Sequence, residues 1–131
     1  AYWMSQAFAK ANKNGGAIVN ISSILGLKPQ GLPQAAYASS KAGLIGLTRD
    51  LAAQWTGRKN IRVNALAPGF FPSEMSDELP KDMVNMIKMF TPAGRLGDPE
   101  ELAATLIWLV SDASSYVTGI TVPVDGGLVM P

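Results

Sequence analysis

The sequence predicts an α/β fold in which three parallel strands alternate with three helices. Three short runs rich in β-branched and apolar residues predict buried strands at Ala17 to Ser22, Ile61 to Leu66 and Ile120 to Asp125. Helical patterns precede the first run and separate the others. The order helix, strand, helix, strand, helix, strand is typical of right-handed crossovers in a parallel sheet.

The first two predicted helices rest on the spacing of apolar side chains. The segment 2–11 carries them at helical intervals, and Gly15 and Gly16 are expected to end that helix. The second helix is expected from about Ala35 to Trp55, closed by Gly57. Its apolar stripe consists of Leu44, Leu47, Leu51 and Trp55.

The third helix has the clearest start. Asp98 is the expected N-cap, Pro99 stands at the first helical position, and Glu101 occupies the reciprocal position of a capping box. We interpret these as capping residues only. A Met-rich segment before them, 79–90, predicts a short helix or a lid.

The composition limits the possible functions. The chain has 131 residues, 47% of them hydrophobic, and a formal net charge of +1, which indicates one globular domain. Its cations are spread along the sequence, so we expect neither a nucleic-acid nor a membrane partner. No apolar run approaches the roughly 20 residues that span a bilayer, and the expected location is cytoplasmic. The chain contains no cysteine and no histidine, so acid–base chemistry must use tyrosine, lysine or carboxylates, and no metal site is expected.

One pair of residues suggests that chemistry. Tyr37 and Lys41 lie four residues apart on a predicted helix and should project to the same side. A nearby ammonium favours the phenolate, which suits a carbonyl-to-alcohol interconversion. Taken alone, the pair is better explained as a solvated helix face. However, Ser22 and Ser23 place hydroxyls at the carboxyl edge of the sheet, where open α/β folds bind ligands.

Four motifs in this order resemble those of the short-chain dehydrogenase/reductase family, over essentially the whole chain. They are NISS at 20–23, YASSK at 37–41, APG at 67–69 and VDGG at 124–127. The resemblance implies the carboxyl-terminal half of a Rossmann-type doubly wound parallel sheet. It also implies an NAD(P)-dependent oxidoreductase that moves a hydride between nicotinamide and a small carbonyl or secondary-alcohol substrate.

The resemblance also implies roles for the hydroxyl and ammonium groups. Tyr37 would be the acid in reduction and the base in oxidation, and Ser23 would hydrogen-bond the substrate carbonyl. Ser23 is preferred because Gly26 matches the family's glycine, with Ser22 as the alternative. Lys41 would favour the tyrosinate and, with Tyr37, contact the cofactor by holding the nicotinamide ribose hydroxyls.

The segment 68–75 resembles the family's stretch over the nicotinamide. Pro68 and Gly69 would shape the turn, the backbone of Phe71 would meet the carboxamide, and Ser73 replaces the usual threonine. Taken alone, Pro68 and Gly69 would be only a strand-ending turn. Nothing in the sequence selects between NAD and NADP.

The Gly-rich phosphate-binding turn of the family is not found in the sequence. We therefore expect 1–131 to be a partial domain without the nucleotide-anchoring half. Such a unit should self-associate as a homo-oligomer, through its first two helices or through an exposed sheet edge. Small residues that would permit close helix approach are Ala35, Ala38, Ala42, Gly43 and Gly46. The alternative function is a catalytically inactive, self-associating fragment that binds no cofactor.

The substrate stays open between two branches of the family. Sequence similarity favours the sugar-acid dehydrogenases, such as gluconate 5-dehydrogenase, followed by the 3-oxoacyl-carrier-protein reductases. Lys81 and Lys88 favour the first branch weakly. The methionines favour the second if they contact substrate, although core filling is an equal explanation for them. They are Met75, Met83, Met86 and Met89. The Asp125-Gly126-Gly127 stretch is expected to be a structural turn.

Overall fold

The computed structural model describes residues 1–31, 33–72 and 80–130 and contains a three-stranded parallel sheet in the order β1-β2-β3. The helices are α1 (Tyr2–Ala11), α2 (Ala35–Lys59), α4 (Lys81–Phe90) and α5 (Pro99–Val110), with short 3-10 turns η1 (Ile24–Gly26) and η2 (Asp112–Ser114). The strands are β1 (Gly16–Ile21), β2 (Ile61–Pro68) and β3 (Thr121–Val124). The predicted class of fold is confirmed.

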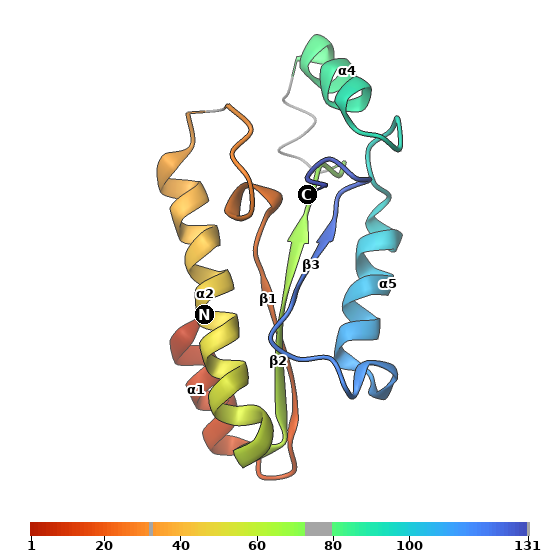
Figure 1. The fold of residues 1–131 in the computed structure, drawn as a ribbon. Helices are drawn as coiled ribbons and strands as arrows, with labels where there is room; N and C mark the ends of the chain where they lie inside the picture. Colours follow the sequence, from red (N-terminus) through yellow and green to blue (C-terminus); the bar gives the residue numbers. More distant parts are fainter. Residues whose placement is uncertain (32, 73–79, 131) are drawn as a thin grey trace.

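The sheet separates two helical layers (Figure 1). Helices α1 and α2 lie on one face and α5 lies on the other. All three strands run in one direction, with Ile18 opposite Val63 and Leu66 opposite Val122. Their carboxyl ends therefore meet at one edge, beyond which α4 lies (Figure 1).

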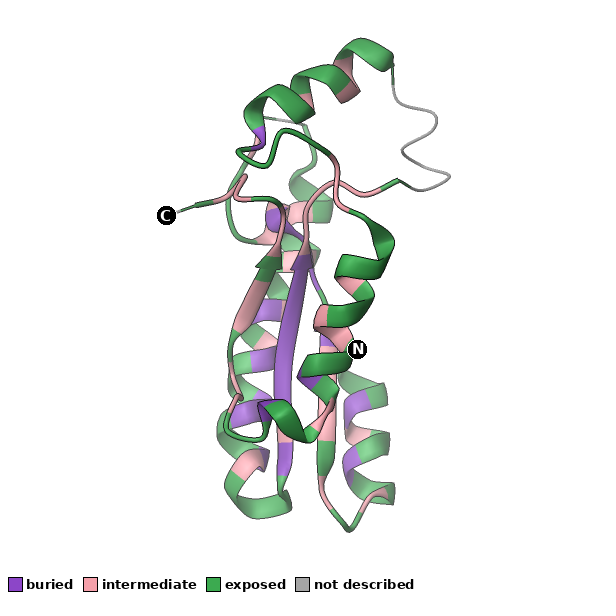
Figure 2. Ribbon diagram, turned by 90° about the vertical axis from the view of Figure 1, so that its right-hand side faces the viewer, coloured by how far each residue is buried: buried purple, intermediate pink, exposed green. Residues whose placement is uncertain are grey.

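The core is built around the central strand β2, which is the most buried strand of the sheet (Figure 2). Its Ile61 and Val63 pack with Leu51 and Trp55 of α2 and with Ala9 of α1. Helix α2 thus buries the carboxyl-terminal part of the predicted stripe, whereas Leu44 and Leu47 are only half-buried. The mainly apolar sequence of β2 suits this position because both of its faces are covered by helices.

Both predicted glycine stops were wrong. Helix α1 ends at Ala11 rather than at the glycines, and Gly16 is already the first residue of β1. Gly57 lies inside α2, which ends at Lys59 with Asn60 in the left-handed conformation (φ 53°). Asparagine is the side chain after glycine that most readily adopts this conformation, so it can replace glycine in closing a helix.

The strand boundaries also differ slightly from prediction. Strand β1 begins and ends one residue earlier than expected, and β3 loses its two predicted end residues. Strand β2 continues through Pro68, which pairs with Val124. Proline is tolerated there because β1 pairs with β2 only as far as Leu66, and the bond to β3 comes from the N–H of Gly69.

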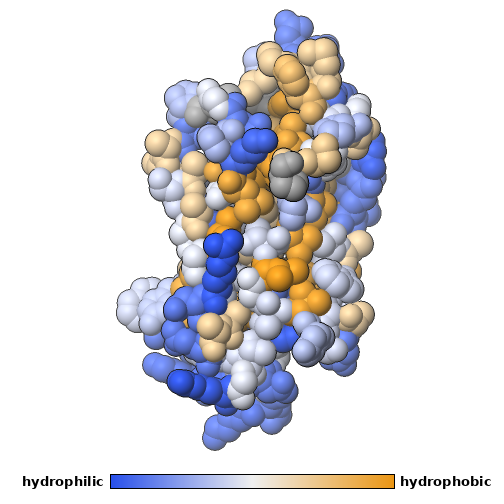
Figure 3. Space-filling model, in the orientation of Figure 1, coloured by the Kyte–Doolittle hydropathy of each residue, from blue (hydrophilic) through white to orange (hydrophobic). Residues whose placement is uncertain are grey.

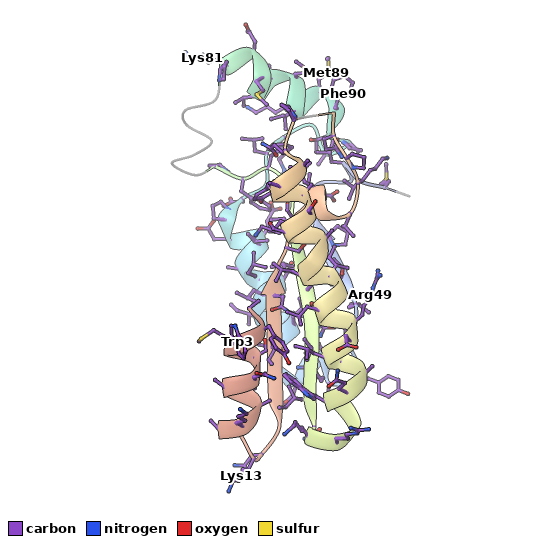
Figure 4. The ribbon with its side chains drawn as sticks, turned by 90° about the vertical axis from the view of Figure 1, so that its left-hand side faces the viewer. Trp3, Lys13, Arg49, Lys81, Met89 and Phe90 are labelled. Carbon is purple, nitrogen blue, oxygen red and sulfur yellow. The ribbon has the colours of Figure 1, made fainter. Side chains whose placement is uncertain are left out.

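Helix α4 is not packed into the core. None of its ten residues is buried, and Met86, Met89 and Phe90 are among its most exposed apolar side chains. Figure 4 shows Lys81 at one end of α4 and Met89 and Phe90 at the other. Of the two explanations for the methionines, core filling is wrong for those in α4, while Met75 lies outside the described residues.

Apolar side chains also reach the surface of the layered part. They gather in a band between α2 and α5 in the view of Figure 3. In the described ranges, no helix is both long enough and apolar enough to cross a bilayer.

Candidate active site

The candidate site lies where the three strands end. Strand β1 runs into Ser22 and Ser23, β2 into Gly69, and β3 into Asp125. The amino-terminal part of α2, which carries Tyr37 and Lys41, lies beside the end of β1. The fold therefore gathers three of the four predicted motifs at one edge through strand ends and brings the fourth to it on α2.

Tyr37 and Lys41 project to the same side of α2, as predicted. The Lys41 Nζ lies 5.5 Å from the centroid of the Tyr37 ring. The same ammonium donates a hydrogen bond to the carbonyl oxygen of Ile21, at 3.0 Å. The lysine head is thus held between the tyrosine and the end of β1, with further N–H donors still available. The Tyr37 side chain stays accessible, with 45% of the residue exposed.

The two serines after β1 have different hydrogen bonds. The hydroxyl of Ser22 donates to the backbone carbonyl of Lys41, at 2.8 Å. The hydroxyl of Ser23 accepts from the backbone N–H of Leu25, at 3.2 Å, and so caps η1. Because this bond uses an oxygen lone pair, the Ser23 O–H remains a donor for another group, whereas the Ser22 O–H is already committed.

Gly26 brings η1 against α2. A Cβ at this position would lie 2.8 Å from the carbonyl carbon of Lys41 and 2.9 Å from the nitrogen of Ala42. These distances are too short for any side chain and the obstacles are backbone atoms. Only glycine allows this contact, which explains the glycine three residues after Ser23.

The segment after β2 is fixed by close backbone contacts. The N–H of Gly69 donates to the carbonyl of Val124, at 2.9 Å. A Cβ on Gly69 would lie 2.7 Å from the Cα of Asp125. The ring of Phe71 packs directly on Gly97, which leaves no space for a side chain there. Pro68 is the last residue of β2 and belongs to the same turn. Ser73 lies outside the described residues.

The turn after β3 is held by its own aspartate. The Asp125 carboxylate accepts from the N–H groups of Gly127, at 3.0 Å, and Val129, at 2.7 Å. Gly126 and Gly127 both have positive φ values, 63° and 89°. Their conformation and the self-contained bonds agree with the interpretation of this stretch as a structural turn.

The start of α5 carries the expected capping box. The Asp98 side chain accepts from the Glu100 N–H, and the Glu101 side chain accepts from the Asp98 N–H, at 2.8 Å. Arg95 adds a bidentate contact to Glu101, with N–O distances of 2.6 and 2.8 Å. Hydrogen bonding from the Arg95 guanidinium, followed by that from the Asp98 N–H, lowers the pKa of Glu101 to about 2.

Sequence reasoning missed two residues that position β3. Arg62 donates to the carbonyls of Leu109, Ser111 and Val117 at distances of 3.0–3.2 Å. Asn64 is fully buried and bonds the chain just before β3 through Val117 and Ile120. The available signal was an arginine and an asparagine inside an otherwise apolar strand, since buried polar groups require partners.

Across 1–31, 33–72 and 80–130, no group of three or more acidic side chains is placed to hold a metal ion. The strand edge carries the hydroxyls of Ser22 and Ser23, the phenol of Tyr37, the ammonium of Lys41 and the carboxylate of Asp125, which holds its own turn.

The structure thus places a hydroxyl, a tyrosine and a lysine at the carboxyl edge of a parallel sheet, as the sequence resemblance led us to expect. Comparison with known proteins agrees with this geometry. Residues 1–129 match the family model described as enoyl-(acyl carrier protein) reductase. The chain belongs to the short-chain dehydrogenase/reductase family.

Three relatives illustrate the range of the family. The chain is 48% identical to 3-oxoacyl-(acyl-carrier-protein) reductase of Thermotoga maritima, covering 90% of this chain and 47% of that protein. Gluconate 5-dehydrogenase of Burkholderia cenocepacia, solved with NADP and tartrate, has a TM-score of 0.84 and 35% identity, covering 97% of this chain and 49% of that one. A 4-hydroxyisoleucine dehydrogenase complexed with NADH has a TM-score of 0.92 and 35% identity, covering 99% and 55%. The chain therefore spans about half the length of the relatives it matches.

Proposed function

We propose that this chain supplies the proton-transfer half of an NAD(P)-dependent oxidoreductase that interconverts a carbonyl and a secondary alcohol. The observation that carries the proposal is the placement of the Lys41 Nζ, 5.5 Å from the Tyr37 ring centroid and 3.0 Å from the Ile21 carbonyl. The ammonium in that place lies beside the phenol ring, uses one N–H on the end of β1 and leaves further donors for a ligand. Membership of the family, with NADP-bound and NADH-bound relatives, supports the cofactor class.

In this proposal, Tyr37 passes a proton to the carbonyl oxygen during reduction and takes it back during oxidation. The free O–H of Ser23 donates to the same oxygen as negative charge develops on it. The hydrogen bonds support Ser23 rather than Ser22 in this role, because the Ser22 hydroxyl already donates to the backbone carbonyl of Lys41.

The residues present fit a nicotinamide cofactor. Lys41 has one N–H directed at Ile21, so its remaining donors suit a pair of ribose hydroxyls. The turn at Pro68, Gly69 and Phe71 lies at the same strand edge and would pair its backbone with the carboxamide. The cofactor, when bound, supplies or accepts the hydride. Comparing the binding of NADH and NADPH will decide between NAD and NADP.

For the substrate we favour a 3-oxoacyl thioester over a sugar acid. Helix α4 presents Met86, Met89 and Phe90 to solvent beyond the strand ends, and flexible apolar side chains suit an acyl chain. The identity with the Thermotoga maritima 3-oxoacyl reductase supports the same class. Lys81 and Lys88, both exposed on α4, are the features that would suit a carboxylate instead.

A titration followed by a turnover assay tests the proposal. We expect NADH or NADPH fluorescence to change on binding, and an acetoacetyl thioester to be reduced faster than 5-ketogluconate. Tyr37→Phe removes only the phenolic hydroxyl and should lower kcat by roughly 10²–10⁴-fold, the usual contribution of a general acid. The matched control is Tyr116→Phe, because Tyr116 is fully exposed on the chain just before β3. The proposal fails if the protein binds neither nucleotide, in which case the inactive, self-associating module remains.

A further inference from the structure

Ser22 is a buried hydroxyl that joins three parts of the fold. The residue is 3% exposed and follows β1 directly. Its N–H donates to the carbonyl of Leu66 in β2, at 2.7 Å, and its hydroxyl donates to the carbonyl of Lys41 in α2, at 2.8 Å. A single residue thus ties the ends of two strands to the helix that carries the predicted acid–base pair.

Lys41 is consequently held at both of its ends. Its backbone carbonyl accepts a hydrogen bond from the Ser22 hydroxyl, and its ammonium donates to the carbonyl of Ile21, the residue before Ser22. The two anchors are consecutive residues of one strand end. A rotation of α2 about its axis or a slide along it would break at least one of these bonds. Tyr37 lies one turn earlier on the same side of α2, so its position is fixed together with that of Lys41.

A third contact restricts the same peptide. The η1 turn approaches the Lys41–Ala42 peptide so closely that Gly26 has no room for a Cβ. The hydrogen bond from Ser22 fixes the direction of the peptide, and the close packing of Gly26 fixes its distance from η1. Ser23 lies between Ser22 and Gly26 in the sequence, so these contacts also define the position of its backbone.

We propose that Ser22 is a positioning residue. It fixes the rotation of α2 about its axis and its position along that axis, and thereby holds Lys41 and Tyr37 in place relative to Ser23. This inference rests on the proposed function. It assigns Ser22 no contact with substrate or cofactor, because its hydroxyl proton is already donated to Lys41.

Ser114 offers a matched control on the other side of the fold. It is 1% exposed, and its hydroxyl also donates to backbone carbonyls, those of Leu109 and Ser111, at 3.0 and 3.1 Å. These hydrogen bonds join the end of α5 to η2 and involve neither α2 nor the strand ends. Ser22→Ala and Ser114→Ala therefore remove the same chemical group from equally buried sites.

The first test is kinetic and uses purified protein with its nucleotide and an acetoacetyl thioester. Ser22→Ala should lower kcat about tenfold or more with KM within about twofold, because small displacements of reacting groups can cost up to 10²-fold in rate. Ser114→Ala should stay within about twofold of the wild type in both constants. Equal losses in the two variants would show a general effect of lost stability and would overturn the inference.

The second test does not need turnover. Hydrogen–deuterium exchange should accelerate in Ser22→Ala at the amides of residues 41–45 in α2, and in Ser114→Ala at the end of α5 instead. Unchanged exchange across residues 41–45 in Ser22→Ala would overturn the inference. If the wild type shows no turnover with either nucleotide, the proposed function fails, while this exchange pattern still decides whether Ser22 holds α2.

Discussion

Buried polar side chains near the strand ends act mainly as spacers and anchors. Asn20 donates to the hydroxyl of Thr48, at 2.9 Å, and Thr48 in turn donates to the carbonyl of Leu44, at 2.8 Å. The Asn20–Thr48 bond joins β1 to α2 about two turns beyond the Ser22–Lys41 bond. Because Asn20 and Thr48 are both buried and both hydrogen-bonded, they add positional definition without the cost of unmatched burial.

Gly26 gives a prediction at this scale. Gly26→Ala should lower the free energy of unfolding by about 1–3 kcal/mol, because the new Cβ would meet the backbone of Lys41 and Ala42 at less than 3 Å. Gly57→Ala is the control, since its Cβ would meet nothing within 4 Å and alanine favours a helix interior by up to about 1 kcal/mol. Urea unfolding measures both. A loss in Gly57→Ala as large as that in Gly26→Ala would contradict this account.

At the scale of elements, α2 and α5 begin in different ways. Helix α5 carries a complete capping box reinforced by Arg95. Helix α2 has no side-chain cap at Gln34 and is held by tertiary contacts from Ser22, Ile21 and Gly26. Local sequence therefore starts α5, whereas the neighbouring strand end holds the start of α2.

The α5 cap predicts a pH dependence of stability. Because folding lowers the pKa of Glu101 from 4.5 to about 2, its contribution is complete above pH 4.5 and is lost as the pH falls from there towards 2. Arg95→Gln should show a shallower fall of Tm across this window, because the guanidinium is the largest cause of the lowered pKa. Both side chains are exposed, so the effect should be modest and should shrink in 1 M salt.

Melting curves between pH 6 and pH 2 provide the measurement. Arg49→Gln is the control, because Arg49 is exposed on α2, away from this cap. Parallel Tm profiles for wild type and Arg95→Gln would show that the ion pair does not contribute.

At the scale of the whole molecule, a large apolar surface stays uncovered. Trp3 and Met4 of α1 are 78% and 75% exposed, and Figure 4 shows Trp3 at the surface of α1. On α2, a Cβ at Gly43 or Gly46 would meet open space, so another helix could approach there. Exposed apolar patches of this kind favour association.

We therefore predict a homo-oligomer with α1 and α2 in its interface. Trp3→Glu should lower the weight-average mass in sedimentation equilibrium, because it would bury a charge against an apolar partner. Tyr116→Glu, a change at a fully exposed residue in the chain between η2 and β3, should leave the mass unchanged. Association that persists in Trp3→Glu would favour the sheet edge as the interface. A wild type with the mass of one chain would contradict the prediction altogether.

Most of the fold could be predicted from the sequence because its signals are local. Apolar runs bounded by turn residues located all three strands, and the Asp98 cap located the start of α5 to the residue. The glycine stops failed because Gly57 tolerates a helix interior and Asn60 adopted the left-handed conformation instead. A single residue near a helix end can be replaced in its role by a neighbour, which is why boundaries are less predictable than elements.

The sequence by itself determined the class of fold, the family and the placement of Tyr37 and Lys41 on one side of a helix, because spacing along a helix or strand fixes which side chains share a face. Only the tertiary structure decided how those residues are held. Ser22 and Ser23 are neighbours with the same side chain, yet one bonds Lys41 and the other caps η1 with its proton free. That difference depends on where α2 packs against β1, a contact between segments nearly twenty residues apart. No local pattern in the sequence encodes it.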